Sequence, residues 1–130
     1  MEESIVKVLV LILRQLPSGC ILHITDYIEN AFSDGQLLPL KQFHIEKESE
    51  KYSFDLSERC ISYLIEELPN YNWVSYLVHY EISHHDRIIM RVLDETIFVL
   101  TPMFHIPEDL VHECEQENIW IYVEDEIKKE

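Results

Sequence analysis

The sequence predicts a single α+β domain, residues 1–130, whose helices pack on a small, mainly antiparallel sheet in the element order αααβββαβ. Two observations lead to this fold class. Four segments carry apolar residues at helical spacing, and four others either alternate apolar with polar residues or form short apolar runs between turn residues. The length of 130 residues and the apolar fraction of 47% suit one domain with its own core.

The first predicted helix covers residues 5–16. Its helically spaced apolar residues are Ile5, Leu9, Ile12, Leu13 and Leu16. The valines and Leu11 between them make the other faces apolar as well, so we expect this helix to be buried nearly all round. Pro17 and Gly19 follow directly and end it.

A short helix and a loop are expected next. Thr25 is a suitable N-cap for a second helix that ends at Phe32. Residues 34–54 contain Gly35, Pro39 and the mixed-charge run IEKESEK, a composition that favours a loop.

A third helix is predicted from Asp55 to Leu68, because Asp55 and Glu58 fit a capping box and apolar residues line one side. Three helices before a hairpin is also the order of a winged helix. DNA binding by that fold needs cations that contact phosphates, whereas this helix carries three glutamates against Arg59. We therefore do not expect the chain to bind nucleic acid directly.

The second half of the chain changes to strand patterns. Residues 74–82 alternate apolar and polar side chains, and the runs at 87–93 and 96–100 read as two more strands, which gives a three-stranded meander. Pro107 then opens a last helix that ends near Glu117, and residues 119–123 form a final strand.

The stretch SHHD lies between the first two strands of the meander. His84, His85 and Asp86 are consecutive, so in a tight turn they point in different directions and cannot all bind one ion. We interpret them as turn residues and expect no metal, no cofactor and no catalytic residue. The two glycines of the chain also exclude a P-loop and a dinucleotide-binding loop.

Cys20, Cys60 and Cys114 are odd in number and widely spaced, with no CxxC pair. They are expected to be reduced, buried thiols of a cytoplasmic protein. The apolar run from Val8 to Leu13 is too short to cross a membrane, and the acidic residues Glu2 and Glu3 do not fit an export signal.

The charge of the chain is large and uneven. The net charge is −15, and residues 60–127 hold fourteen acidic residues against two arginines, a net charge of −12. Such a surface repels nucleic acid and anionic membranes, and it attracts basic partners, among which proteins that bind nucleic acid are the most common.

These features predict a small, acidic, non-enzymatic inhibitor or binding protein that blocks a basic, nucleic-acid-engaging surface of a partner, as phage anti-defence proteins and toxin-immunity proteins do. The expected partner-binding residues are Glu108, Asp109, Glu113, Glu115, Glu117, Glu124, Asp125 and Glu126. Trp120 and Tyr122 share one strand face and could anchor a partner, although core positions are more usual for them.

Three alternatives stay open at this point. The chain could be a structural or regulatory subunit that forms a homodimer through its apolar first helix. It could be a metal-dependent enzyme that uses His79, His84, His85 and Asp86. The acidic surface could also serve only to keep the protein soluble.

Overall fold

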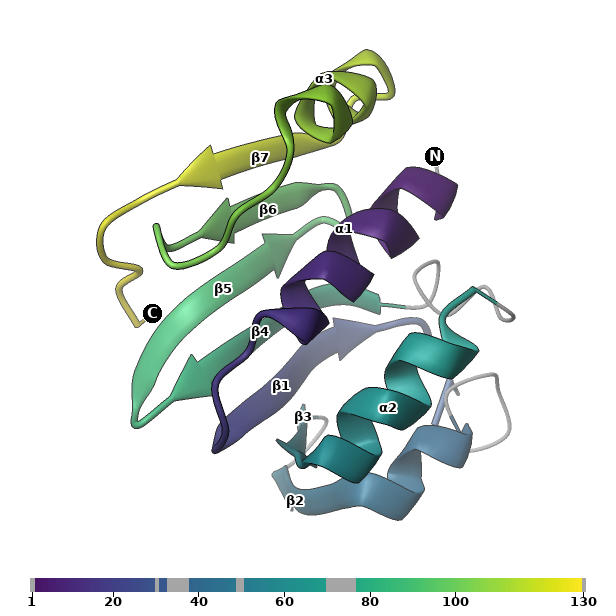
Figure 1. Ribbon diagram of the computed structural model, residues 1–130. Helices are drawn as coiled ribbons and strands as arrows, with labels where there is room; N and C mark the ends of the chain where they lie inside the picture. The colour runs from purple at the N-terminus through teal and green to yellow at the C-terminus, as the bar shows by residue number, and fades with distance from the viewer. Residues whose placement is uncertain (1, 30, 33–37, 49–50, 70–76, 130) are drawn as a thin grey trace.

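The computed structural model describes residues 2–29, 31–32, 38–48, 51–69 and 77–129, and shows an α+β fold (Figure 1). Its helices are α1 (Glu2–Arg14), the 3-10 helix η1 (Leu38–Phe43), α2 (Glu58–Glu67) and α3 (Glu108–Gln116). Its strands are β1 (Cys20–Tyr27), β2 (His44–Glu48), β3 (Lys51–Leu56), β4 (Leu77–His84), β5 (Arg87–Leu93), β6 (Ile97–Leu100) and β7 (Trp120–Val123).

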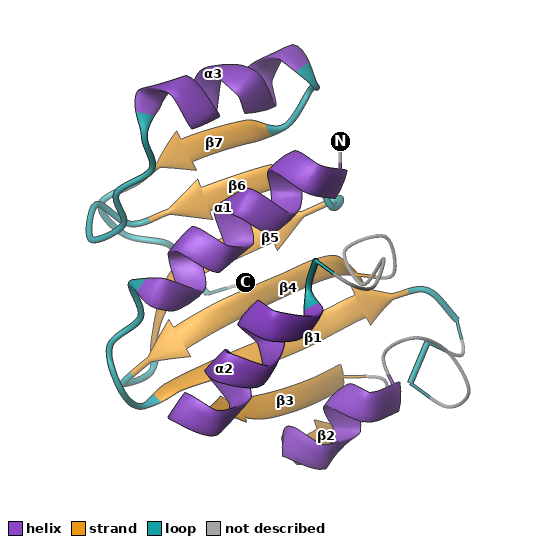
Figure 2. Cartoon of the chain, turned by 45° about the vertical axis from the view of Figure 1, so that its right-hand side comes forward, coloured by secondary structure: helices purple, strands orange, loops and turns teal. Residues whose placement is uncertain are grey.

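The seven strands form one mixed sheet in the order β2-β3-β1-β4-β5-β6-β7. All neighbours pair antiparallel except β6 and β7, which are parallel and are connected through α3. Helices α1 and α2 cover one face, and α3 lies beside β7 at the end of the sheet (Figures 1 and 2). In the described part of the chain no helix covers the opposite face, which we call the open face.

The core lies between the helices and the covered face of the sheet. Helix α1 buries one side, formed by Ile5, Val8, Leu9, Ile12 and Leu13. Its other apolar residues are only partly buried, so the helix is less enclosed than the sequence led us to expect. The strands add fully buried side chains to the same core, among them Met90 and Phe98.

The expected second helix at residues 25–32 is wrong, because residues 20–27 form strand β1. Cys20, Leu22 and Ile24 are buried in alternation with half-buried side chains, which is the period of a strand. Strand β1 pairs on both sides, with β3 and β4. Thr25 lies inside this strand and caps no helix.

The expected loop at residues 34–54 is also wrong for most of its length. Residues 38–43 form η1, and residues 44–48 and 51–56 form the antiparallel pair β2 and β3. Residues 34–37 and 49–50 lie outside the described part of the chain. Strands β1, β2 and β3 lie between α1 and α2, so the order αααβββαβ is only roughly consistent with the structure, which has more strands than predicted, and the winged-helix order does not hold.

The remaining predicted helices and strands are present as helices and strands in the structure. Helix α2 begins three residues later than expected, and its N-cap is Ser57, whose hydroxyl accepts a hydrogen bond from the backbone N–H of Cys60. Asp55 belongs to β3 and does not cap the helix. The predicted meander is β4-β5-β6, with residues 74–76 outside the described part of the chain, and the last helix and strand are α3 and β7.

The three cysteines are free and buried, as predicted. Burial raises the pKa of each thiol, to about 11 for Cys60, which lies between α2 and the sheet and is also close to the carboxylate of Asp55. The thiols are therefore protonated and unreactive near neutral pH. None of the helices in the described residues has the length and apolar character needed to cross a membrane.

Candidate functional site

Helix α3 and the segment after β7 carry the predicted acidic residues at one edge of the sheet. Six of these eight residues are exposed and, in addition, have no Lys or Arg partner among the described residues. We call these six the acidic edge: Glu108, Asp109, Glu115, Glu124, Asp125 and Glu126. Helix α3 runs antiparallel to β7, so the start of α3 and the end of β7 lie at the same end of these two elements (Figure 1).

Glu113 and Glu117 have a different environment, because they face α1. The ammonium group of Lys7 lies 3.3 Å from Oε1 of Glu113, and the buried hydroxyl of Ser4 donates hydrogen bonds to both carboxylates. The hydrogen bond from Ser4 lowers the pKa of Glu117, and the hydrogen bond to Glu113 raises the pKa of Lys7. These two glutamates connect α3 to α1.

Strand β7 exposes three large apolar side chains beside the acidic edge. Trp120, Tyr122 and Val123 keep 40%, 52% and 62% of their surface accessible. Core positions are more usual for Trp120 and Tyr122, and the structure departs from that expectation because β7 is the outermost strand. Their ring faces are therefore available to a partner.

The SHHD stretch forms a turn, as predicted. His84 ends β4 and pairs with Arg87, so His85 and Asp86 make a two-residue hairpin loop with φ values of 50° and 63°. Positive φ at both positions is what a type I′ turn requires. The rings of His84 and His85 lie against each other, with centroids 3.9 Å apart.

His79 does not join the other histidines. Its Nδ1 accepts a hydrogen bond from the backbone N–H of Asp94, and its Nε2 lies 3.7 Å from a carboxylate oxygen of Asp94 and 3.9 Å from one of Asp26. Within the described residues no group of three or more His, Cys, Asp or Glu side chains is arranged to hold a metal ion. The metalloenzyme alternative therefore gains no support from His79, His84, His85 and Asp86.

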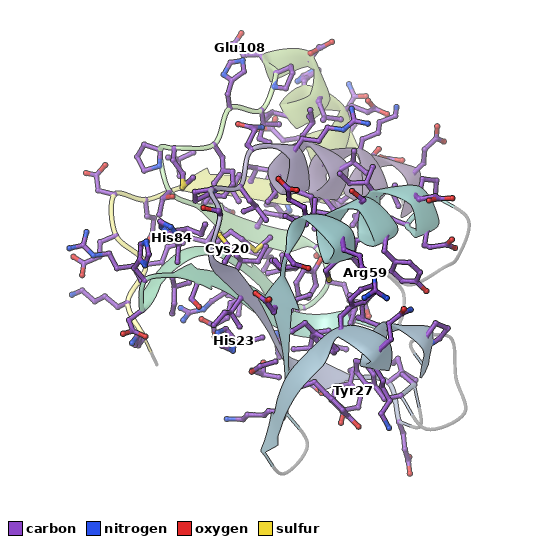
Figure 3. The ribbon with its side chains drawn as sticks, turned by 60° about the horizontal axis from the view of Figure 1, so that its bottom comes forward. Cys20, His23, Tyr27, Arg59, His84 and Glu108 are labelled. Carbon is purple, nitrogen blue, oxygen red and sulfur yellow. The ribbon has the colours of Figure 1, made fainter. Side chains whose placement is uncertain are left out.

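A polar cluster on the open face was not predicted from the sequence. His23, in β1, lies between two serine hydroxyls, with Nδ1 2.9 Å from Ser53 in β3 and Nε2 3.0 Å from Ser83 in β4. Figure 3 shows His23 far from Glu108 of α3. The three residues line a groove of about 620 Å³. The only sequence signal was the alternation in CILHIT, which predicts a strand with His23 facing away from the core.

The His23 cluster has part of the geometry of a nucleophile and its base. A neutral imidazole has one acceptor nitrogen and one donor nitrogen, so one serine donates to His23 while the other accepts from it. Acyl transfer also needs N–H donors for the developing oxyanion. Strand β1 is paired on both sides, so its backbone N–H groups around His23 are used within the sheet. This arrangement suits a structural hydrogen-bond bridge across three strands.

An ion pair of Arg91 with Glu81 lies further along the same face. Arg91 of β5 donates to Glu81 of β4 at 3.5 Å and to the backbone carbonyl of Lys128 at 3.0 Å. Ile127 is buried and pairs with Ile88 beside the start of β5. Together these contacts hold the segment after β7 against the sheet, which fixes where Glu124, Asp125 and Glu126 lie.

A scan against protein-family models and searches of curated proteins and of solved structures found no match to this chain.

Proposed function

We propose that this chain is a small, acidic, non-enzymatic binding protein that blocks a basic, nucleic-acid-engaging surface of a partner protein. Phage anti-defence proteins and toxin-immunity proteins are the functional types that this proposal fits. The observation that carries it is the position of the acidic edge. Its carboxylates have no Lys or Arg partner in the described chain, and they lie beside exposed aromatic rings on an edge strand.

Charge supports the proposal in two ways. A net charge of −15 attracts basic surfaces over long distances and speeds their association. A carboxylate without a Lys or Arg partner can also form a charge-assisted hydrogen bond with a partner's Arg or Lys without first breaking an ion pair to a Lys or Arg of its own chain. The residues proposed to meet a partner are therefore those of the acidic edge, and not Glu113 or Glu117.

The two alternative functions have less support from the contacts. The buried side of α1 faces the sheet, and within the described ranges none of the large exposed apolar side chains belongs to α1, so self-association through that helix would have only its half-buried residues to use. For the enzyme alternative, no group of three or more metal-ligating side chains is arranged to hold an ion among the described residues, and the His23 cluster lacks free backbone donors on β1. A binding role at the acidic edge accounts for its carboxylates and for the exposed aromatic rings of β7, which neither alternative uses.

The proposal is tested by capture from the source cell with two matched variants. One carries Glu115→Lys, Glu124→Lys and Glu126→Lys, and the control carries Glu29→Lys, Asp55→Lys and Glu67→Lys, which change the net charge equally at sites away from the acidic edge. Lysates are treated with nuclease, and captured proteins are identified by mass spectrometry.

We expect the wild type and the control to retain the same basic protein, which added DNA or RNA displaces and which the acidic-edge variant fails to retain. Retention that is equal for all three proteins, or that nucleic acid does not disturb, would contradict the proposal.

A further inference from the structure

The open face carries an apolar patch on its last three strands. Residues paired in register share a face of the sheet, and the pairs here run from Leu93 through Ile97 to Trp120 and from Val99 to Tyr122. We call these five residues the docking face. The residues between them, among them Val92, Phe98 and Leu100, are buried on the covered face.

The docking face is exposed on the edge strand β7 and is bounded by Arg91 on β5. Leu93, Ile97 and Val99 are half-buried, while Trp120 and Tyr122 are exposed. Arg91 lies next to Val99 in register, and its guanidinium is occupied by Glu81 and by the carbonyl of Lys128. An apolar patch next to a satisfied polar border is the usual arrangement at the centre of a protein interface.

Acidic residues border the docking face at both ends of its strands. Asp94 and Glu95 form the β5–β6 turn beside Leu93 and Ile97, and the side chain of Asp94 is 75% exposed. Glu124 follows β7 directly, one residue after Val123, and Asp125 and Glu126 come next. The patch therefore has a negative rim at each end.

We propose that the docking face is the centre of the partner interface, and that its occupant is a basic protein surface with apolar side chains between its cations. This inference rests on the function proposed above and adds the binding mode. A second copy of this chain would bring two negative rims together, and each copy carries a net charge of −15, so charge favours a basic partner over self-association. The acidic residues would guide the approach, and Trp120 and Tyr122 would supply the buried contact.

Two peptide probes test the docking face directly. One is a heptapeptide of alternating Lys and Leu, KLKLKLK, and the other is KSKSKSK, which has the same charge but no apolar side chain. Each is titrated into ¹⁵N-labelled wild-type protein and into a variant with Val99→Ser and Tyr122→Ser, and amide shifts are followed by NMR. Sedimentation of the protein alone measures self-association.

We expect KLKLKLK to bind the wild type about tenfold more tightly than KSKSKSK and to shift the amides of β6 and β7, and we expect this difference to vanish in the variant. Equal binding of both peptides at the acidic residues would overturn the docking face while leaving the proposed function intact. If neither peptide binds at low salt, the proposed function fails as well. A stable dimer that buries β6 and β7 would also overturn the inference, since a second copy would then occupy the face.

Discussion

His85 and Asp86 show at the level of single residues why this turn is structural. Both have positive φ, a region that costs most non-glycine residues roughly 1–2 kcal/mol but that His, Asn and Asp tolerate better. His85 and Asp86 are therefore explained by turn geometry and by solvent exposure, without any ligand.

This explanation predicts that the Gly and Ala variants rank in opposite order of stability at the adjacent positions His84 and His85. At His85, Gly should be more stable than Ala by about 1 kcal/mol, because only Gly adopts positive φ freely. At His84, the last residue of β4, whose backbone is paired with Arg87, Gly should be less stable than Ala by about 0.5–1 kcal/mol. Urea denaturation of the four variants measures both differences, and the same ranking at both positions would show that the turn is formed differently.

Cys60 gives a second prediction at the residue scale, for alkaline pH. Burial raises the pKa of its thiol to about 11, so above pH 9 the unfolded chain loses this proton before the folded chain does. The stabilisation is complete below the unfolded pKa and is lost as the pH rises toward 11, by about 2 kcal/mol. Cys60→Ala removes this dependence.

Denaturation in reducing buffer at pH 7, 9 and 10.5 checks the Cys60 prediction. The stability advantage of the wild type over Cys60→Ala should shrink as the pH rises. An advantage that stays constant up to pH 10.5 would mean that the folded thiol ionises as easily as the unfolded one.

Helix α1 forms where the sequence predicted a helix, but it is buried on one side and not nearly all round as expected. Val8 and Ile12 are fully buried against the sheet, whereas Val10 and Leu11 are only partly buried. Ile12→Ala should therefore lower the free energy of unfolding by about 2–5 kcal/mol, and Val10→Ala should cost clearly less. Equal losses in denaturant midpoint for the two variants would contradict the one-sided burial of α1.

The elements that the sequence did not predict are those whose structure depends on distant partners. Helix α1, helix α3 and strand β5 carry strong local periodicity and were predicted with the correct type. Strand β1 was mistaken for a helix because Thr25 and Asp26 resemble a helix start, yet its neighbours β3 and β4 are about 30 and 60 residues away. Residues 44–56 are rich in charge and were read as a loop, although β2 and β3 pair with each other and β3 also pairs with the distant β1.

The candidate site was predictable only in part, because some of its contacts join residues that are distant in the sequence. Charge is local in sequence, so the acidic residues from Glu108 to Glu126 could be identified from composition alone. That Glu113 and Glu117 instead contact α1 depends on the packing of α3 against Lys7 and Ser4. The His23 cluster and the docking face depend on strand register, which no local pattern specifies.

At the scale of the whole molecule, the net charge of −15 has a consequence for stability. Like charges repel more strongly in the compact folded state than in the expanded unfolded chain. Raising the NaCl concentration from about 0.01 to 0.15 M shortens the Debye length from about 30 to 8 Å, so the melting temperature should rise. A melting temperature that is unchanged or falls would show that local ion pairs such as Lys7 with Glu113 outweigh the repulsion.

The central claim, that the acidic edge binds a basic partner, is tested most directly by the association rate constant of the captured partner. Surface plasmon resonance across a salt series would measure this rate constant for three proteins. They are the wild type, the acidic-edge variant with Glu115→Lys, Glu124→Lys and Glu126→Lys, and the control variant with Glu29→Lys, Asp55→Lys and Glu67→Lys. We predict that the wild-type rate constant falls steeply with salt, that the acidic-edge variant associates at least about tenfold more slowly at low salt, and that the control stays close to the wild type. A rate constant that does not depend on salt, or an acidic-edge variant that associates as fast as the control, would contradict the claim.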